Sequence, residues 1–177
     1  MEGMKVASRY AQSLLELAQE KNVIDDVLAD MNTLLKTTNN NRDFHLFLTS
    51  PLIKADKKSQ ILNILFGDFQ ELSLKFMHLL TRNHREMYLP LIAKNFIDKV
   101  NKLRNIVPIT ITSAVKLDEG VKESILKKLN ENVKGTIELT EEVNKELIGG
   151  FVARMGDARI DASVSNQLKK IKKRLLK

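Results

Sequence analysis

Few residues of this chain belong to the types that do chemistry, and their spacing favours no reaction. The sequence holds no cysteine, so it offers neither a thiol nucleophile nor a disulfide framework. The histidines are His45, His78 and His84; no two stand four residues apart, and no acidic residue completes a metal-site spacing. We interpret them as surface or structural histidines, and the serines fit no nucleophile-elbow motif. The sequence therefore predicts no catalytic residue and no metal site.

The glycines near the C-terminal end do not form a phosphate-binding loop. Gly149-Gly150 followed by Gly156 matches neither phosphate-loop spacing, and no Gly-Lys-Ser or Gly-Lys-Thr occurs. We therefore expect the chain alone to bind no nucleotide and no other cofactor. Asp161 and Ser163 resemble a catalytic pair, but helix capping explains them better, because both side chains accept hydrogen bonds from free helix N–H groups.

Composition and charge are those of a soluble globular protein with mild basicity. Hydrophobic residues make up 43% and charged residues 29%, and the net charge of +7 is shared as +3 over residues 1–104 and +4 over 105–177. Six of the residues in 169–177 are basic. We interpret them as a solvated helix face, with contact to an acidic partner or to phosphates as the alternative. No apolar run approaches the ~20 residues that a membrane helix needs.

Apolar spacing and the scarcity of glycine predict that the first part of the chain is nearly all helix. Two of the seven glycines precede residue 105, and glycine disfavours helix interiors. The expected helices cover 4–20, 24–38, a short segment around 44–48, the segment between an Asp56 N-cap and a Gly67 stop, 69–82, and a sixth helix with Pro90 in its first turn. Ser50-Pro51 ends the third helix, because the residue before proline avoids the helical region.

The apolar pattern changes to a strand period after residue 105. Pro108 lies in the first alternating stretch and indicates a strand that starts there or lies at a sheet edge. The elements expected after it are a helix near 118–133, an extended segment over 136–139, a hairpin of strands 151–155 and 159–160 around the turn Gly156-Asp157, and a terminal helix capped by Asp161 or Ser163. From that terminal helix, Leu168, Ile171 and Leu175 are expected to face inward.

The sequence thus predicts an α+β protein with two domains. An N-terminal six-helix bundle covers 1–104, and a small α+β domain with a β-hairpin and a terminal helix covers 105–177. The first and fifth helices of the bundle carry smooth apolar stripes, and a groove between two such helices suits a partner helix. The alternative is that both stripes are simply bundle core.

Five short motifs, in order along nearly the whole chain, resemble those of the delta subunit family of F-type ATP synthases, which includes the mitochondrial oligomycin-sensitivity protein. They are Arg9-Tyr10-Ala11-Gln12-Ser13-Leu14; Phe47-Leu48-Thr49-Ser50-Pro51 followed by Lys57 or Lys58; Asn83-His84-Arg85; Ser113-Ala114-Val115-Lys116-Leu117; and Ile148-Gly149-Gly150, Gly156-Asp157 and Ile160-Asp161-Ala162-Ser163-Val164. One departure is Ala162, where family members often have glycine; alanine is strained there if the position needs a positive φ.

The resemblance implies a non-catalytic stator subunit that links the catalytic head to the peripheral stalk, so that rotor torque is converted to ATP synthesis. The domain over 1–104 is then expected to bind the N-terminal helix of an alpha subunit, and the candidate residues are Tyr10, Ala11, Leu14, Met77 and Leu80. The domain over 105–177 is expected to bind the b subunits, and the candidates are Phe151, Val152, Leu168 and Ile171, for which a core position is the alternative. The implied location is the cytoplasmic face of the bacterial plasma membrane, with peripheral attachment through the complex and no nucleic acid among the partners.

The rival hypothesis is a basic two-domain protein that binds nucleic acid. Its affinity for DNA or RNA would fall steeply with salt. Sheet-type RNA binding needs aromatic residues on strands, and Phe151 is the single aromatic residue in the expected strands. A small enzyme is disfavoured because no set of catalytic residues occurs.

Overall fold

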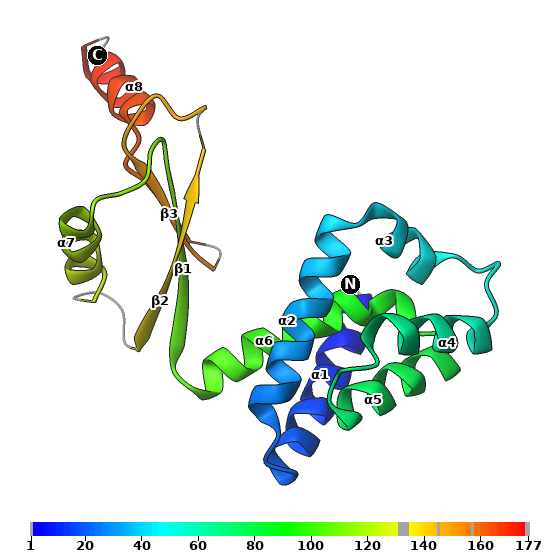
Figure 1. The fold of residues 1–177 in the computed structure, drawn as a ribbon. Helices are drawn as coiled ribbons and strands as arrows, with labels where there is room; N and C mark the ends of the chain where they lie inside the picture. Colours follow the sequence, from blue (N-terminus) through cyan, green and yellow to red (C-terminus); the bar gives the residue numbers. More distant parts are fainter. Residues whose placement is uncertain (1, 131–134, 145, 157, 176–177) are drawn as a thin grey trace. The chain divides into compact units, whose positions relative to one another are not determined.

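A computed structural model describes residues 2–130, 135–144, 146–156 and 158–175 of the chain. The chain divides into two compact units, Met1–Val100 and Asn101–Lys177 (Figure 1). Helices make up the first unit and the second holds a sheet, so the architecture is α+β, as expected. The division falls inside helix α6 (Leu89–Leu103), ahead of the boundary expected at residue 104.

The helices of the first unit, as far as the structure describes it, share one apolar core. They are α1 (Glu2–Glu20), α2 (Ile24–Asn40), α3 (Arg42–Thr49), α4 (Ala55–Phe66), α5 (Glu71–Arg82), the short 3₁₀ helix η1 (Glu86–Tyr88) and α6. Each α-helix buries residues at helical spacing, such as Leu14 and Ala18 of α1 or Phe96 and Val100 of α6. The periodicity of the sequence therefore predicts that each helix has a core stripe, but it does not place every residue of the stripe correctly, since Ile61 and Leu65 of α4 are exposed.

Three of the four expected helix-end signals of this unit act as predicted, and one of them is Pro90, which lies in the first turn of α6. Ser50 is extended and ends α3 ahead of Pro51, and Gly67 directly follows the last residue of α4. The expectation that Asp56 caps α4 is wrong. Lys54 holds the N-cap position without a side-chain bond, and Asp56 lies in the first turn, where its charge complements the helix dipole.

Helix α5 ends in a Schellman motif that has histidine at the left-handed position. His84 has φ 54°, its N–H donates to the Thr81 carbonyl at 3.1 Å, and the Arg85 N–H donates to the Leu80 carbonyl at 2.8 Å. The same arrangement follows α1, with Asn22 at φ 56°. The chain thus reverses after α5 without glycine, at a cost in backbone energy.

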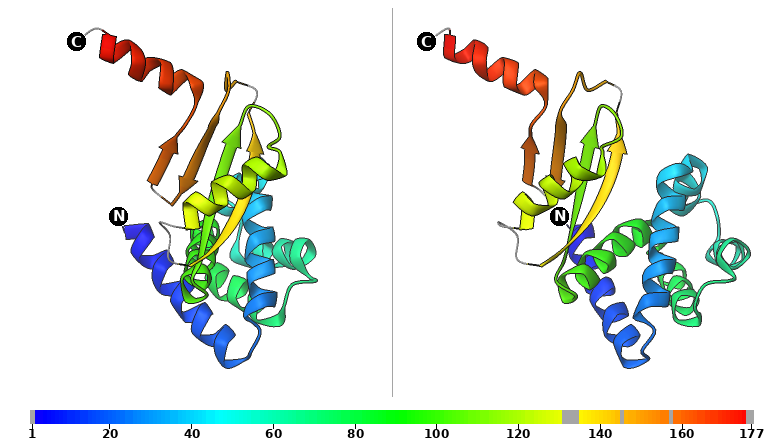
Figure 2. Two further views of the ribbon diagram at one scale, coloured as in Figure 1. Left: turned by 90° about the vertical axis from the view of Figure 1, so that its left-hand side faces the viewer. Right: turned by 60° about the vertical axis from the view of Figure 1, so that its left-hand side comes forward.

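The second unit contains a mixed four-stranded sheet in the order β2-β1-β3-β4. Its strands are β1 (Ile106–Ser113), β2 (Thr136–Val143), β3 (Phe151–Met155) and β4 (Ala158–Asp161). Strands β1 and β2 run parallel and are connected through α7 (Glu119–Asn130), whereas β3 is antiparallel to both of its neighbours. Helix α7 lies against one face of the sheet (Figure 2), where Ile125 packs with Ile109 and Ile111.

Strand β1 is central, so the expectation that Pro108 starts the strand or marks a sheet edge is wrong. Pro108 pairs with Glu138 of β2, but the pairing with β3 begins one residue later, at Ile109. Proline lacks a backbone N–H and is tolerated here because β3 does not reach it.

The expected hairpin is confirmed by the antiparallel pairing of β3 with β4. Met155 pairs with Ala158, and Gly156 between them has φ 55°. Asp157, the second residue of the expected turn, lies outside the described residues.

The bend before this hairpin also needs glycine: at Gly150, with φ 78°, a Cβ would lie 2.5 Å from the Ala162 carbonyl oxygen. Ala162 itself is not among the residues with positive φ, so the departure from the family's glycine brings no strain of that kind.

The expected N-cap of the terminal helix, α8 (Val164–Leu175), is confirmed. The Ser163 hydroxyl oxygen accepts a hydrogen bond from the Asn166 N–H at 3.3 Å. Asp161 Oδ1 accepts from the Ser163 hydroxyl at 2.6 Å and from its N–H at 3.1 Å. These bonds from Ser163, with the Arg159 guanidinium nearby, hold the pKa of Asp161 below its usual value. Asp161 and Ser163 thus act together in capping.

Candidate partner-binding surfaces

Four of the five residues predicted to bind the alpha-subunit helix lie in the core of the first unit. Ala11, Leu14, Met77 and Leu80 are fully buried and belong to the shared apolar core. Their side chains offer no surface to a partner in this conformation. Tyr10, the fifth, is partly exposed and packs against the edge of that core.

The border between α1 and α5 carries the partly exposed side chains of Tyr10, Leu17 and Leu79 beside the buried Phe76. The Tyr10 ring meets the Phe76 ring edge-on, with centroids 6.2 Å apart. Helical spacing puts Leu17 on the Tyr10 side of α1 and Leu79 on the Phe76 side of α5. Leu17 is 42% exposed and Leu79 is 48% exposed. We call the surface of Tyr10, Leu17, Phe76 and Leu79 the α1–α5 seam.

Arg85 holds Tyr10 in position at one end of the α1–α5 seam. Its Nη1 donates to the Tyr10 hydroxyl at 2.8 Å, and its guanidinium carbon lies 5.5 Å from the centre of the Tyr10 ring. The left-handed His84 turns the chain back so that Arg85 reaches α1. Sequence reasoning noticed the motif Asn83-His84-Arg85 but missed its partner, because 75 residues separate Tyr10 from Arg85.

The four residues predicted to bind the b subunits divide into two pairs. Val152 is buried and Phe151 is partly buried against the apolar core of the sheet. Leu168 and Ile171 of α8 are 59% and 52% exposed, so the expectation that they face inward is wrong. The reason is that α8 projects beyond the end of the sheet, as Figures 1 and 2 agree. The Leu175 side chain lies outside the described residues.

Helix α8 presents an apolar stripe with basic residues around it. Val164, Leu168 and Ile171 follow one another at helical spacing and are all exposed. The loop before β3 adjoins the first turn, since the Val164 N–H donates to the Gly149 carbonyl at 3.0 Å, and it adds the exposed Ile148. We call Ile148, Val164, Leu168 and Ile171 the α8 stripe. Its exposed basic neighbours are Lys169, Lys170, Lys172 and Lys173.

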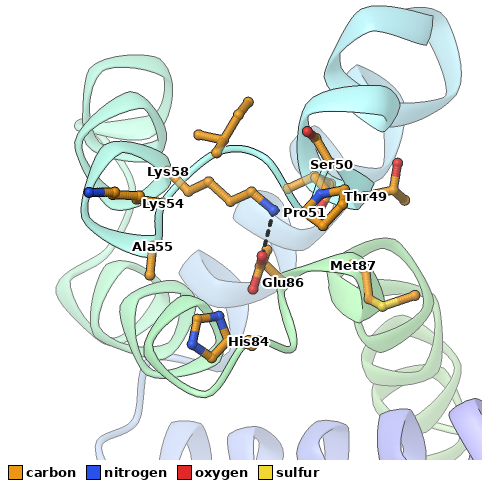
Figure 3. Close-up of a pocket in the computed structure, with 11 residues that line it drawn as sticks. Thr49, Ser50, Pro51, Lys54, Ala55, Lys58, His84, Glu86 and Met87 are labelled. Atoms are coloured by element: carbon orange, nitrogen blue, oxygen red, sulfur yellow. Dashed lines mark hydrogen bonds and ion pairs between the residues drawn. The ribbon is translucent and has the colours of Figure 1, made fainter.

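A cavity of about 470 Å³ lies between the Ser50-Pro51 corner, the start of α4 and the turn before η1 (Figure 3). A buried ion pair lines it: Lys58 Nζ lies 2.6 Å from Glu86 Oε1 and also donates to the Leu48 carbonyl at 3.0 Å. The side chains of Lys58 and Glu86 are 3% and 9% exposed. Glu86 Oε2 has no hydrogen-bond partner among the described residues. Lys58, rather than Lys57, is therefore the lysine that links the end of α3, through the Leu48 carbonyl, to Glu86.

The remaining polar groups indicate structure rather than chemistry. His78 links α4 to α5, because Nδ1 bonds to the Ser59 hydroxyl and Nε2 lies 2.8 Å from Asn63 Oδ1. Within the described ranges, no group of His, Asp or Glu residues is placed to hold a metal ion. Among the helices described, none has the length and apolarity to cross a membrane.

The structure thus has a helical unit and a mixed-sheet unit, and each exposes apolar side chains of the kind that marks contact surfaces for other polypeptides. Residues 6–175 match the family model described as ATP synthase delta (OSCP) subunit. The chain belongs to this family, whose members are structural stator subunits and not enzymes. The family expected from the five motifs is confirmed.

Individual relatives agree with this assignment. The chain is 37% identical over 175 residues to the ATP synthase subunit delta of Christiangramia forsetii, covering 99% of this chain and 95% of the relative. It is 34% identical to the same subunit of Carboxydothermus hydrogenoformans, covering 98% of each chain. A chain in the cryo-EM structure of the Toxoplasma gondii mitochondrial ATP synthase hexamer shares the fold, with a TM-score of 0.72, 22% identity and 97% coverage of both chains. These matches give the nucleic-acid alternative no support.

Proposed function

We propose that this chain ties the catalytic head of an F-type ATP synthase to the peripheral stalk, with one binding surface on each unit. The observation that carries the proposal is the pair of open apolar surfaces, the α1–α5 seam and the α8 stripe. The head must resist the torque of the rotor, and a link with two separate surfaces meets that need. Attachment to the membrane is peripheral, through the complex, and we place it at the cytoplasmic face of the bacterial plasma membrane.

The first contact joins the unit over residues 1–104 to the N-terminal helix of an alpha subunit at the α1–α5 seam. Tyr10, Leu17 and Leu79 touch the partner, while Leu14 and Leu80 stay buried in the shared core of the unit. Apolar burial contributes ~25 cal/mol per Å², and the ordering of the partner helix subtracts from that gain.

The second contact joins the unit over residues 105–177 to the C-terminal ends of the b subunits at the α8 stripe. Leu168 and Ile171 supply the apolar contact, and the surrounding lysines favour a partner with acidic side chains. Phe151 and Val152 lie in strand β3 of the hairpin, where Phe151 packs against the core of the sheet and Val152 is buried, and they do not touch the partner.

The head contact is tested by calorimetric titration of the full chain with a peptide of the alpha-subunit N-terminus from the same organism. We expect one-to-one binding that Leu79→Asp weakens by roughly a hundredfold or more, since a buried unpaired carboxylate is costly. The matched control is Leu52→Asp, at an exposed leucine in the loop between α3 and α4. Equal binding by the Leu79 variant and the unaltered chain would remove the seam from the proposal.

The stalk contact is tested by titration with the soluble part of the b subunits. We expect Leu168→Asp to weaken this binding and to leave the alpha peptide's affinity unchanged. Val115→Asp is the control, because Val115 is exposed in the same unit but lies outside the α8 stripe. A b-subunit affinity that falls equally in both variants would contradict the assignment to α8.

A further inference from the structure

The two helices that form the α1–α5 seam run in opposite directions. Near the start of α1, a Cβ at Gly3 would lie 3.0 Å from the Tyr88 ring, which comes after α5 in the chain. Farther along α1, Tyr10 bonds to Arg85, which follows the end of α5, and packs against Phe76 inside α5. The start of α1 therefore lies toward the end of α5, and the end of α1 lies toward the start of α5. The direction of each helix along the seam is therefore fixed by these contacts.

Charge is distributed unevenly along the seam. One end, beside the end of α5, carries the exposed arginines Arg9, Arg82 and Arg85. The opposite end carries the exposed carboxylates Glu16, Glu20 and Glu71, with Lys21 and Lys75 as counter-charges. The arginine end has a net charge of about +3, and the other end is weakly negative.

We propose that the partner helix lies antiparallel to α1, with its C-terminal end at Arg9, Arg82 and Arg85. This orientation rests on the proposed contact with an alpha-subunit helix. A helix carries about half a negative charge at its C-terminus and half a positive charge at its N-terminus. The antiparallel orientation sets both partial charges against opposite charges, whereas the reverse orientation sets both against like charges.

The arginines also have donors to offer the partner. A guanidinium has five N–H donors, and the bond to the Tyr10 hydroxyl uses one of those of Arg85. The last carbonyls of a helix lack intrahelical partners, so a helix that ends here places free acceptors beside free donors. Acidic side chains in the last turns of the partner would add charge-assisted bonds. The seam thus selects a partner helix whose acidic residues lie toward its C-terminal end.

The orientation is tested with the isotope-labelled full chain and alpha-subunit peptides that carry a nitroxide spin label at either end. We expect the C-terminal label to broaden the amide signals of residues 6–10 and 83–86, and the N-terminal label those of 17–21 and 71–75. The opposite pattern would overturn the orientation and leave the head contact standing. An absence of peptide binding, or broadening confined to other surfaces, would overturn both.

A charge-reversal pair supplies a second test. We expect Arg9→Glu with Arg82→Glu to weaken the peptide's affinity by roughly tenfold at low salt, and the effect to shrink as salt screens it. The matched control is Lys57→Glu with Lys94→Glu, which changes the net charge equally at exposed positions on α4 and α6. If both pairs weaken binding equally, net charge alone is responsible and the proposed orientation loses its cause.

Discussion

The ion pair between Lys58 and Glu86 gives the sharpest prediction about stability. Replacing Lys58 by Met leaves a buried carboxylate without its cation and the Leu48 carbonyl without its donor. Breaking a buried pair in this way typically costs about 3–5 kcal/mol. Because a whole domain is stable by only about 5–15 kcal/mol, the Lys58→Met chain should lose a large part of the stability of its first unit.

The double variant Lys58→Met with Glu86→Leu should recover most of that loss. Glu86 Oε2 already lacks a hydrogen-bond partner among the described residues, so the native pair is incompletely compensated. Two apolar side chains of similar volume avoid the desolvation cost of both charges. The Leu48 carbonyl still lacks its hydrogen-bond donor, which costs about 1–2 kcal/mol of unfolding free energy. We therefore expect a coupling free energy of several kcal/mol between the two positions.

The assay is urea unfolding followed by tyrosine fluorescence. The chain has two tyrosines, Tyr10 and Tyr88, and no tryptophan, so this signal reports the first unit alone. Lys57→Met, at the exposed neighbouring position, is the control and should change the unfolding free energy by less than about 0.5 kcal/mol. A cost below about 1 kcal/mol for Lys58→Met, or a double variant less stable than either single one, would refute the reasoning.

Three further predictions concern backbone conformation and pH. His84→Gly should stabilise the first unit by about 0.5–1 kcal/mol in the same assay, and Asn22→Gly by less, because asparagine tolerates the left-handed region better than histidine. Gly150→Ala should destabilise the second unit by more than about 1 kcal/mol, measured by circular dichroism during urea unfolding. The folded-state pKa of Asp161 is lowered, so its stabilisation is present above pH about 4 and is lost as pH falls. The stability difference between the unaltered chain and Asp161→Asn should therefore narrow between pH 7 and pH 3.

Local signals in the sequence predict the helices well, because apolar spacing and end residues act over a few positions. Ser50 before Pro51 and Gly67 after Phe66 end their helices where expected. Ser163 likewise caps α8 through a bond to a residue three positions away. The hairpin of β3 and β4 is also predictable, since its strands lie on either side of a glycine turn.

The sequence does not reveal which side of an apolar stripe remains open. Leu14 and Leu17 both belong to the apolar side of α1, yet the first is buried and the second is partly exposed. The difference depends on how closely α5 approaches, which spacing along α1 does not encode. The stripe of α8 has the same ambiguity, because Leu168 and Ile171 suit a core or a partner equally well.

Strand order also escapes sequence reasoning. The position of β1 between β2 and β3 depends on residues far along the chain. Pro108 suggests an edge strand because it lacks a backbone N–H, but it pairs with β2, and β3 pairs with β1 only from Ile109 onward. The choice between Lys57 and Lys58 is similar. Both lysines follow the Ser50-Pro51 corner, and the buried Glu86 forms its ion pair with Lys58. The sequence does not show this pairing, because Glu86 lies far along the chain.

The central place of β1 determines the order in which the two units are able to fold during synthesis. The first unit is complete in the chain before β1 begins, and its contacts are mainly between helices close in sequence. Strand β1, with Ile109 and Ile111, leaves the ribosome before either of its neighbouring strands exists, because Ile106 pairs with Thr136 and Ser113 with Phe151. The helical unit is therefore complete while the apolar side of β1 is still without its neighbouring strands, and transiently exposed apolar surface of this kind is prone to aggregation.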